Sequence, residues 1–88
     1  MKINSINSTN FKGLLIFQDK NNPALQQAIN TDHIVKIDNC GTKNYVCTSI
    51  ALSDGSIPKF DVPFDEVTRA YQKAGSTSYE RLMCNSIS

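Results

Sequence analysis

The clearest pattern of hydrophobic and polar residues lies between positions 45 and 52. Val46, Ile50 and Leu52 would share one side of an extended chain, and Cys47 and Ser49 would lie on the other. A period of two residues is what a strand with one buried face requires. We therefore predict a strand over 45–52, preceded by a loop over 38–44 whose glycine is free to take a positive φ.

Two more strands are predicted before this one. Residues 11–17 are aliphatic and aromatic and run into turn-forming residues at 18–23. Gly13 inside this segment indicates a bulge or a close approach of another stretch of backbone. Residues 28–37 have apolar positions on both sides of a polar insert at 30–32, where we expect a kink or a tight turn within one strand.

A hairpin signal follows the strand 45–52. Asp54-Gly55 favours a type I′ turn, because both central residues of that turn need a positive φ. The return strand is predicted over 57–62. Pro58 has no N–H to donate, so this strand is expected at the edge of a sheet.

An amphipathic helix is predicted over 63–74. Pro63 begins it, acidic residues occupy its first turn, Lys73 lies in its last turn, and Gly75 follows as the left-handed residue that ends it. The apolar stripe consists of Phe64, Val67, Ala70 or Tyr71, and Ala74. A helix of about three turns is too short to be stable alone, so this stripe must pack on the sheet.

These elements predict an α+β fold in a single domain over 1–88. A small antiparallel sheet of roughly three to four strands, arranged as a meander, carries the C-terminal helix on one face. The folded body spans 11–75, and residues 1–10 form a loose N-terminal arm. Residues 76–88 are a tail or a short second helix, since Thr77 and Glu80 have capping-box spacing.

Composition narrows the classes of protein. Hydrophobic residues make up 40% of the 88 positions, which is enough for one modest core and argues against a wholly disordered chain. The net charge is +1 and the basic residues are scattered, so strong non-specific binding of nucleic acid is not favoured.

Cysteine use and the apolar runs indicate a cellular location. The longest apolar run, 14–17, is far too short to span a membrane, and the N-terminus lacks the apolar stretch of a secretory signal. The three cysteines are an odd number without the spacing of a disulfide framework. We therefore expect free thiols, a cytoplasmic location and no membrane partner.

One stretch of sequence carries a family resemblance. The order is INTDHI at 29–34 with Ile37, then SIALSDG at 49–55, then Val62 and FDEV at 64–67. This pattern resembles small bacterial β-meander-plus-helix proteins, of which the FlbD-type flagellar and swarming-motility proteins are the example. The resemblance covers roughly half of the chain, and its motifs are structural. It implies a small bacterial accessory or regulatory protein without catalysis.

Few residues point to chemistry, and each also has a structural interpretation. His33, the only histidine, could act as a general base oriented by Asp32 or Asn30, or it could simply begin a strand. A Cys₃His zinc site would need Cys40, Cys47, Cys84 and His33 together. Six residues separate Cys40 from Cys47, whereas zinc ligands usually come in closer pairs, so we expect no metal and no cofactor.

Two further groups of residues are open to both interpretations. Carboxylates near the start of the helix could do acid–base work, but they also suit the helix dipole: Asp61, Asp65 and Glu66. Aromatic residues could stack nucleobases on a sheet face, or could form the core: Phe11, Phe17, Tyr45 and Phe60.

The sequence favours a non-enzymatic binding or regulatory module that acts through protein–protein contacts, including self-association as a homodimer. The alternatives are a weak nucleic-acid-binding protein that uses the sheet face and a small enzyme that uses His33. No catalytic residue is assigned. The candidate partner-binding residues are Ile57, Lys59, Tyr79, Leu82 and Met83.

Overall fold

The computed structural model describes residues 13–85 and 87. The predicted arm 1–10 and the start of the first predicted strand, Phe11 and Lys12, lie outside the described residues. The described chain forms two three-stranded sheets and one α-helix, which confirms the α+β prediction with more strands than the meander we expected.

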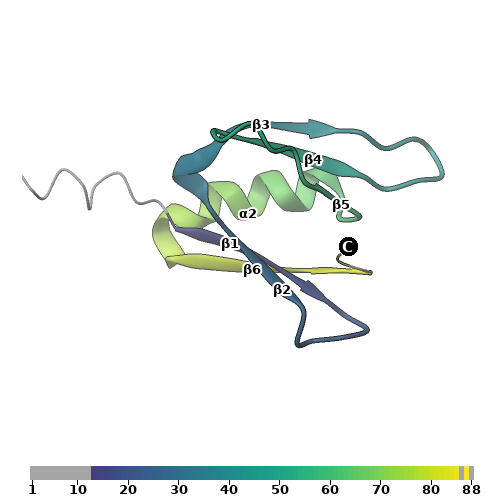
Figure 1. The fold of residues 1–88 in the computed structure, drawn as a ribbon, viewed down its shortest axis with the longest axis horizontal. Coiled ribbons are helices and arrows are strands. Elements are labelled where there is room, and N and C mark those ends of the chain that lie inside the picture. Colours follow the sequence, from purple (N-terminus) through teal and green to yellow (C-terminus); the bar gives the residue numbers. More distant parts are fainter. Residues whose placement is uncertain (1–12, 86, 88) are drawn as a thin grey trace, which may run out of the picture.

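The first sheet has the strand order β2–β1–β6 (Figure 1). Its central strand β1 (Leu14–Asp19) pairs antiparallel with β2 (Gln26–Asn30) and parallel with β6 (Tyr79–Cys84). The prediction of a tail or short helix over 76–88 was therefore wrong. Leu82 and Cys84 are buried while Arg81 and Met83 are exposed, so the period is that of a strand rather than of a helix.

The second sheet has the order β3–β4–β5: β3 (Ile34–Asn39), β4 (Thr48–Leu52) and β5 (Lys59–Phe60). A 3₁₀ turn, η1 (Thr31–His33), joins β2 to β3 and carries the chain from one sheet to the other. The predicted kink at 30–32 is thus confirmed. Asn30 Oδ1 accepts a hydrogen bond from Asp32 N at 2.9 Å, which stabilises the turn locally.

The hairpin between β4 and β5 is present, but its turn is not type I′. Gly55 N donates to Leu52 O and Leu52 N donates to Ser56 O, both at 2.9 Å, and of the turn residues only Gly55 has a positive φ, at 94°. This is the three-residue loop that places a glycine in the left-handed region. β5 lies at the edge of its sheet, as Pro58 predicted.

Helix α2 (Phe64–Thr77) begins after Pro63 as predicted but continues through Gly75. Ser78 takes the left-handed conformation instead, with φ 77°, so Gly75 is not the C′ residue and Lys73 is not in the last turn. The end of the helix is set by tertiary contact rather than by the local glycine: Leu14 N at the start of β1 donates to Ser78 O at 3.0 Å.

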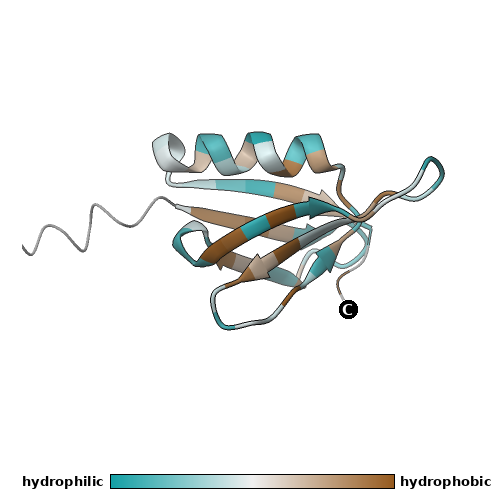
Figure 2. Ribbon diagram, turned by 90° about the horizontal axis from the view of Figure 1, so that it is seen from above, coloured by the Kyte–Doolittle hydropathy of each residue, from teal (hydrophilic) through white to brown (hydrophobic). Residues whose placement is uncertain are grey.

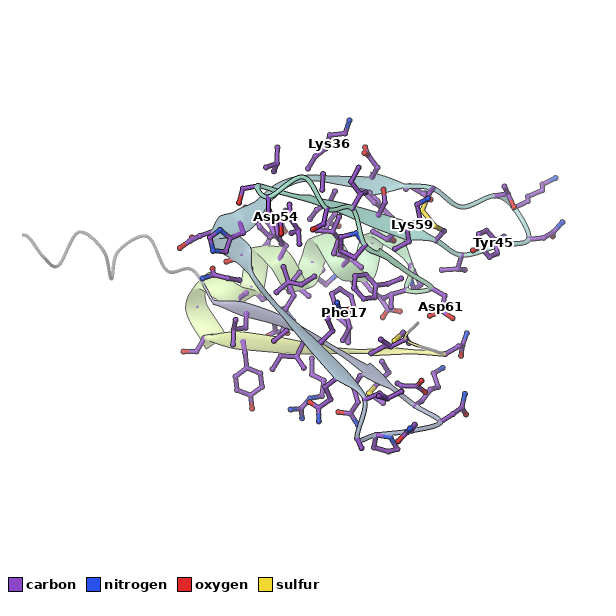
Figure 3. All side chains as sticks on the ribbon, viewed as in Figure 1. Phe17, Lys36, Tyr45, Asp54, Lys59 and Asp61 are labelled. Atoms are coloured by element: carbon purple, nitrogen blue, oxygen red, sulfur yellow. A yellow bond between two sulfur atoms is a disulfide. The ribbon has the colours of Figure 1, made fainter. Side chains whose placement is uncertain are left out.

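A single core joins both sheets and the helix. Phe17 and Phe60 stack with ring centroids 3.8 Å apart, and Phe17 lies between the two sheets in Figure 3. The predicted helix stripe is confirmed for Val67, Ala70 and Ala74, which are buried in this core, whereas Phe64 is half-buried and lies outside it. The helix covers one side of the strands, which is visible from above in Figure 2. In the described chain, no α-helix covers the opposite side of the strands.

Candidate functional site

A cleft of about 600 Å³ lies between β2 and the turn that joins β4 to β5. None of its lining residues comes from α2, which flanks the strands on the other side (Figures 1 and 2). The cleft is lined by Gln27, Ala28, Ile29, Asn30, His33, Leu52, Ser53, Asp54, Ser56, Ile57 and Pro58. A cleft of this size suits a small molecule or a few side chains of a peptide.

Two contacts between His33 and Ser53 fix one end of the cleft. Ser53 N donates to His33 O at 2.8 Å, and Ser53 Oγ lies 3.3 Å from His33 Nδ1. The kink after β2 and the hairpin after β4 are therefore held together at this end. The sequence placed these residues twenty positions apart, so only the fold brings them together.

Asp54 supplies a negative charge at the same end. Its Oδ1 accepts hydrogen bonds from Ser56 Oγ at 2.6 Å and Ser56 N at 2.9 Å. These bonds, the hydroxyl first, lower the pKa of the Asp54 carboxyl below its ordinary value. Asp54 is therefore ionised at neutral pH, and it lies beside the kink in Figure 3.

The other wall of the cleft is an open strand edge. Asp19 N donates to Leu25 O, and Thr31 N donates to Gly13 O, at the two ends of the β1–β2 pair. Because hydrogen-bonded positions alternate in an antiparallel pair, Gln27 and Ile29 face β1 through their backbone groups. The N–H and C=O groups of the even positions, Gln26, Ala28 and Asn30, then point away from β1. In the described chain no strand pairs with this edge.

Apolar residues line the remaining part of the cleft. Ile29 is buried at its base, whereas the Ile57 side chain is 58% exposed at its rim. Pro58 O accepts a hydrogen bond from Ile50 N, and this bond holds the end of the loop beside β4. Ser53 bonds to His33 at the kink, whereas Phe60, three residues after Ile57, stacks on Phe17, which pairs with Gln27. The loop therefore runs along β2. The cleft has a polar end at Asn30, His33, Ser53 and Asp54 and a more apolar end at Ala28, Ile57 and Pro58, which also includes Gln27 and Ser56.

His33 does not form a catalytic triad here. Its ring contacts an exposed serine at 3.3 Å, but no hydrogen bond or ion pair joins the imidazole to a carboxylate among the described residues. The nearest candidate, Asp54, uses Oδ1 to bind Ser56. A triad needs the carboxylate to orient the imidazole. The predicted partners of His33, Asp32 and Asn30, instead bond to each other within η1.

The predicted partner-binding residues fall in three places. Ile57 lines the cleft, and Lys59 lies exposed on the edge strand β5. Tyr79 and Met83 are 51% and 44% exposed on the outer face of β6, where the Arg81 guanidinium lies 5.9 Å from the Tyr79 ring centroid. Leu82 points the other way and is buried in the core, so it is not available to a partner.

The prediction of three free thiols was wrong. Cys40 and Cys47 form a disulfide, with their Cα atoms 5.0 Å apart. The register pairs Asn39 with Thr48, so Cys40 and Cys47 directly oppose each other just beyond the ends of β3 and β4. This hairpin geometry explains why a separation that does not suit zinc does suit a disulfide.

Cys84 keeps a free thiol, but not in a mobile tail. It is buried on β6, and burial, with added repulsion from Asp61 and Asp19, raises the pKa of the thiol. Cys84 and His33 lie on different elements from the disulfide. Within 13–85 and 87, no group of three or more His, Cys, Asp or Glu side chains is placed to bind a metal ion.

The other candidate groups are dispersed. Asp61 accepts a hydrogen bond from Asn85 N at 2.9 Å, while Asp65 and Glu66 lie in the first turn of α2, so the three carboxylates do not form one site. Phe17 and Phe60 are core residues. Tyr45 lies on the loop between β3 and β4 (Figure 3), where it lines a hollow with Pro63 and Phe64. The candidate aromatics among the described residues therefore do not share an exposed sheet face.

Sequence reasoning missed the polar end of the cleft. Asp54 and Ser56 were assigned only to a turn, and Asn30 to a kink and to the orientation of His33. One signal was available in the two polar turns, at 30–32 and 53–56. Each is rich in side-chain oxygens and adjoins an apolar strand, and such turns come close together where the strands pack. The open edge of β2 had no such signal, because pairing is not visible in composition.

Comparison with protein-family models, curated proteins and solved structures finds no match to this chain. In the described part of the chain, no helix has the length and apolar character to cross a membrane. The resemblance to FlbD-type proteins stays a prediction.

Proposed function

We propose that this protein is a small peptide-binding module, which holds an extended segment of another protein along the open edge of β2. The open edge carries the proposal, because it forms one wall of the cleft. A bound strand would hydrogen bond to the outward N–H and C=O of Ala28 and to the N–H of Asn30, whose C=O is used at the start of η1. In this mode of recognition the main chain provides affinity and the pocket beside it provides selectivity.

The lining of the cleft favours a peptide over the other two candidates. Within 13–85 and 87, the lining contains no lysine or arginine, which a nucleic-acid site would need to neutralise phosphates. Its one histidine lacks the orienting carboxylate that hydrolysis would need. The cleft does offer an apolar wall beside free backbone donors and acceptors, and these are the two parts of a site for strand addition.

The proposal agrees with the regulatory role implied by the resemblance to FlbD-type proteins but does not depend on it. The cellular location is a separate question. Our cytoplasmic prediction drew on free thiols, whereas disulfides usually persist in oxidising compartments. The Cys40–Cys47 bond therefore removes that support.

Replacing Ala28 tests the strand edge directly. Ala28→Pro removes an N–H that points away from β1, so the β1–β2 ladder is retained while an incoming strand loses a donor and meets the proline ring. Peptides selected from a phage-displayed random heptapeptide library on the wild-type protein should bind this variant about ten-fold or more weakly. Fluorescence anisotropy with labelled peptides measures the change.

Ala28→Ser is the matched control, because it changes the same residue and keeps the N–H. It should bind the selected peptides like the wild type, and thermal melts should show all three proteins folded. If no peptide is enriched, or if the proline variant binds the enriched peptides unchanged, strand addition at β2 is refuted.

A further inference from the structure

We infer that the segment held in the cleft carries a large aliphatic residue and, two positions away, a lysine or arginine. The inference rests on the proposed function and specifies its partner. It follows from the different chemistry of the two ends of the cleft and from the spacing between them.

The apolar end selects the aliphatic residue. Ile57 is 58% exposed, and it lines the cleft together with Pro58, Ala28 and the buried Ile29. A side chain placed here would cover Ile57, which otherwise faces water. Burial of apolar area is favourable, at roughly 25 cal/mol for each Å².

The polar end selects the cation. Among the described residues of the lining, Asp54 is the only acidic one, and no lysine or arginine neutralises it. Its Oδ1 is occupied by the two bonds from Ser56, while Oδ2 accepts no hydrogen bond from the described residues. A ligand cation is the natural partner of such an oxygen, because hydrogen bonds between charged groups are the stronger kind.

The spacing comes from the strand that forms the wall. The loop runs along β2 from the His33–Ser53 contact toward the stack of Phe60 on Phe17, whose partner in β2 is Gln27. This direction places the polar end nearer to Asn30 and the apolar end nearer to Ala28, two residues earlier in β2. In an added strand, residues two apart point to the same side and lie about 7 Å apart. The aliphatic and basic residues of the ligand are therefore at positions i and i+2.

Synthetic heptapeptides test the basic position. The probe is a threonine-rich peptide with isoleucine at its third position and lysine at its fifth, and its partner has glutamine in place of the lysine. NMR titration of the labelled protein gives both dissociation constants. The lysine peptide should bind the wild type about two- to five-fold more tightly, and this advantage should shrink as salt is added.

Two variants locate the charge. Asp54→Asn should remove the advantage of the lysine peptide and leave the glutamine peptide unchanged. Asp32→Asn is the matched control, because it removes an exposed carboxylate from the neighbouring turn η1, outside the lining of the cleft. It should preserve the preference for lysine.

The outcomes separate this inference from the proposed function. The basic position would be overturned if the wild type bound the two peptides equally, or if Asp54→Asn and Asp32→Asn had equal effects. Either result would do so even if Ala28→Pro still weakened the binding of both peptides. An analogue with alanine in place of isoleucine that binds as well as the parent would overturn the aliphatic position. If Ala28→Pro has no effect on any bound peptide, strand addition itself fails.

Discussion

Ser56 lowers the pKa of Asp54, the residue on which the charge of the cleft depends. Its hydroxyl donates to Asp54 Oδ1 at 2.6 Å and is the largest cause of the lowered pKa. Ser56→Ala removes this bond but keeps the backbone N–H donor at 2.9 Å. We expect the pKa of Asp54 to rise part of the way to its ordinary value, measured by carboxyl-carbon NMR during a pH titration.

The sign of the linked stability effect follows from the direction of this shift. A carboxyl whose pKa is lower in the folded state stabilises that state above its unfolded pKa, and the contribution is lost as the pH falls through the folded value. The wild type should therefore retain this contribution at neutral pH and lose it in acid, with a smaller loss in Ser56→Ala. Ser53→Ala is the control, and a titration of Asp54 identical in Ser56→Ala and the wild type would contradict this account.

At the scale of elements, Gly13 joins the start of β1 to the end of α2. Its φ is 122°, its carbonyl accepts hydrogen bonds from Thr31 N and Thr31 Oγ1, and a Cβ there would meet the carbonyl oxygen of Ala74 and that of Ser78. Gly13→Ala should lower the free energy of unfolding by at least about 2 kcal/mol, because it combines a strained backbone with a clash against backbone atoms. Urea denaturation measures this loss.

Gly55 provides the matched control for Gly13. It also has a positive φ, at 94°, but an added Cβ there meets nothing within 4 Å. Gly55→Ala should therefore cost only the backbone strain, on the order of 1 kcal/mol. If the two variants lost the same free energy of unfolding, the close approach of β1 to α2 would contribute nothing to the effect of Gly13→Ala.

Local patterns predicted those elements whose ends are set locally. Alternation identified β4, Pro63 identified the start of α2, and the polar insert identified η1. The misplaced features are those fixed by distant partners. β6 was missed because its pairing partner is β1, more than sixty residues earlier, and α2 passes Gly75 because Ser78 is bonded to Leu14. The site shares this limit, since Ser53 meets His33 only through the packing of the sheets.

At the scale of the whole molecule, separate contacts hold the two sheets together. Phe17 of one sheet stacks on Phe60 of the other, and the kinked ribbon through η1 joins the sheets covalently. Asp61 reaches across to Asn85 at the end of β6. The cleft opens beside the contact of His33 with Ser53, between β2 and the hairpin after β4. The same architecture that leaves an edge unpaired therefore creates the site beside it.

The disulfide closes the β3–β4 loop at the other end of the molecule, and its presence can be checked by counting thiols. Of the three cysteines only Cys84 is free, and it is 1% exposed with a raised pKa. A thiol reagent should therefore react slowly with the native protein. After denaturation without reductant it should detect one thiol per chain, and after denaturation with reduction it should detect three. Three thiols in unreduced, denatured protein would show that the bond does not form.

The stability that this bond supplies comes mainly from restricting the unfolded chain. Closing a loop with a sequence separation of seven residues is worth about 2.5 kcal/mol on chain-entropy grounds. Replacing Cys40 and Cys47 by alanine together should lower the free energy of unfolding by this amount, measured by urea denaturation. Peptide binding should persist, because the bond lies outside the lining of the cleft. A double variant as stable as the wild type would mean that the hydrogen bonds of the loop already restrict the chain: Cys40 N to Cys47 O and Thr42 N to Tyr45 O.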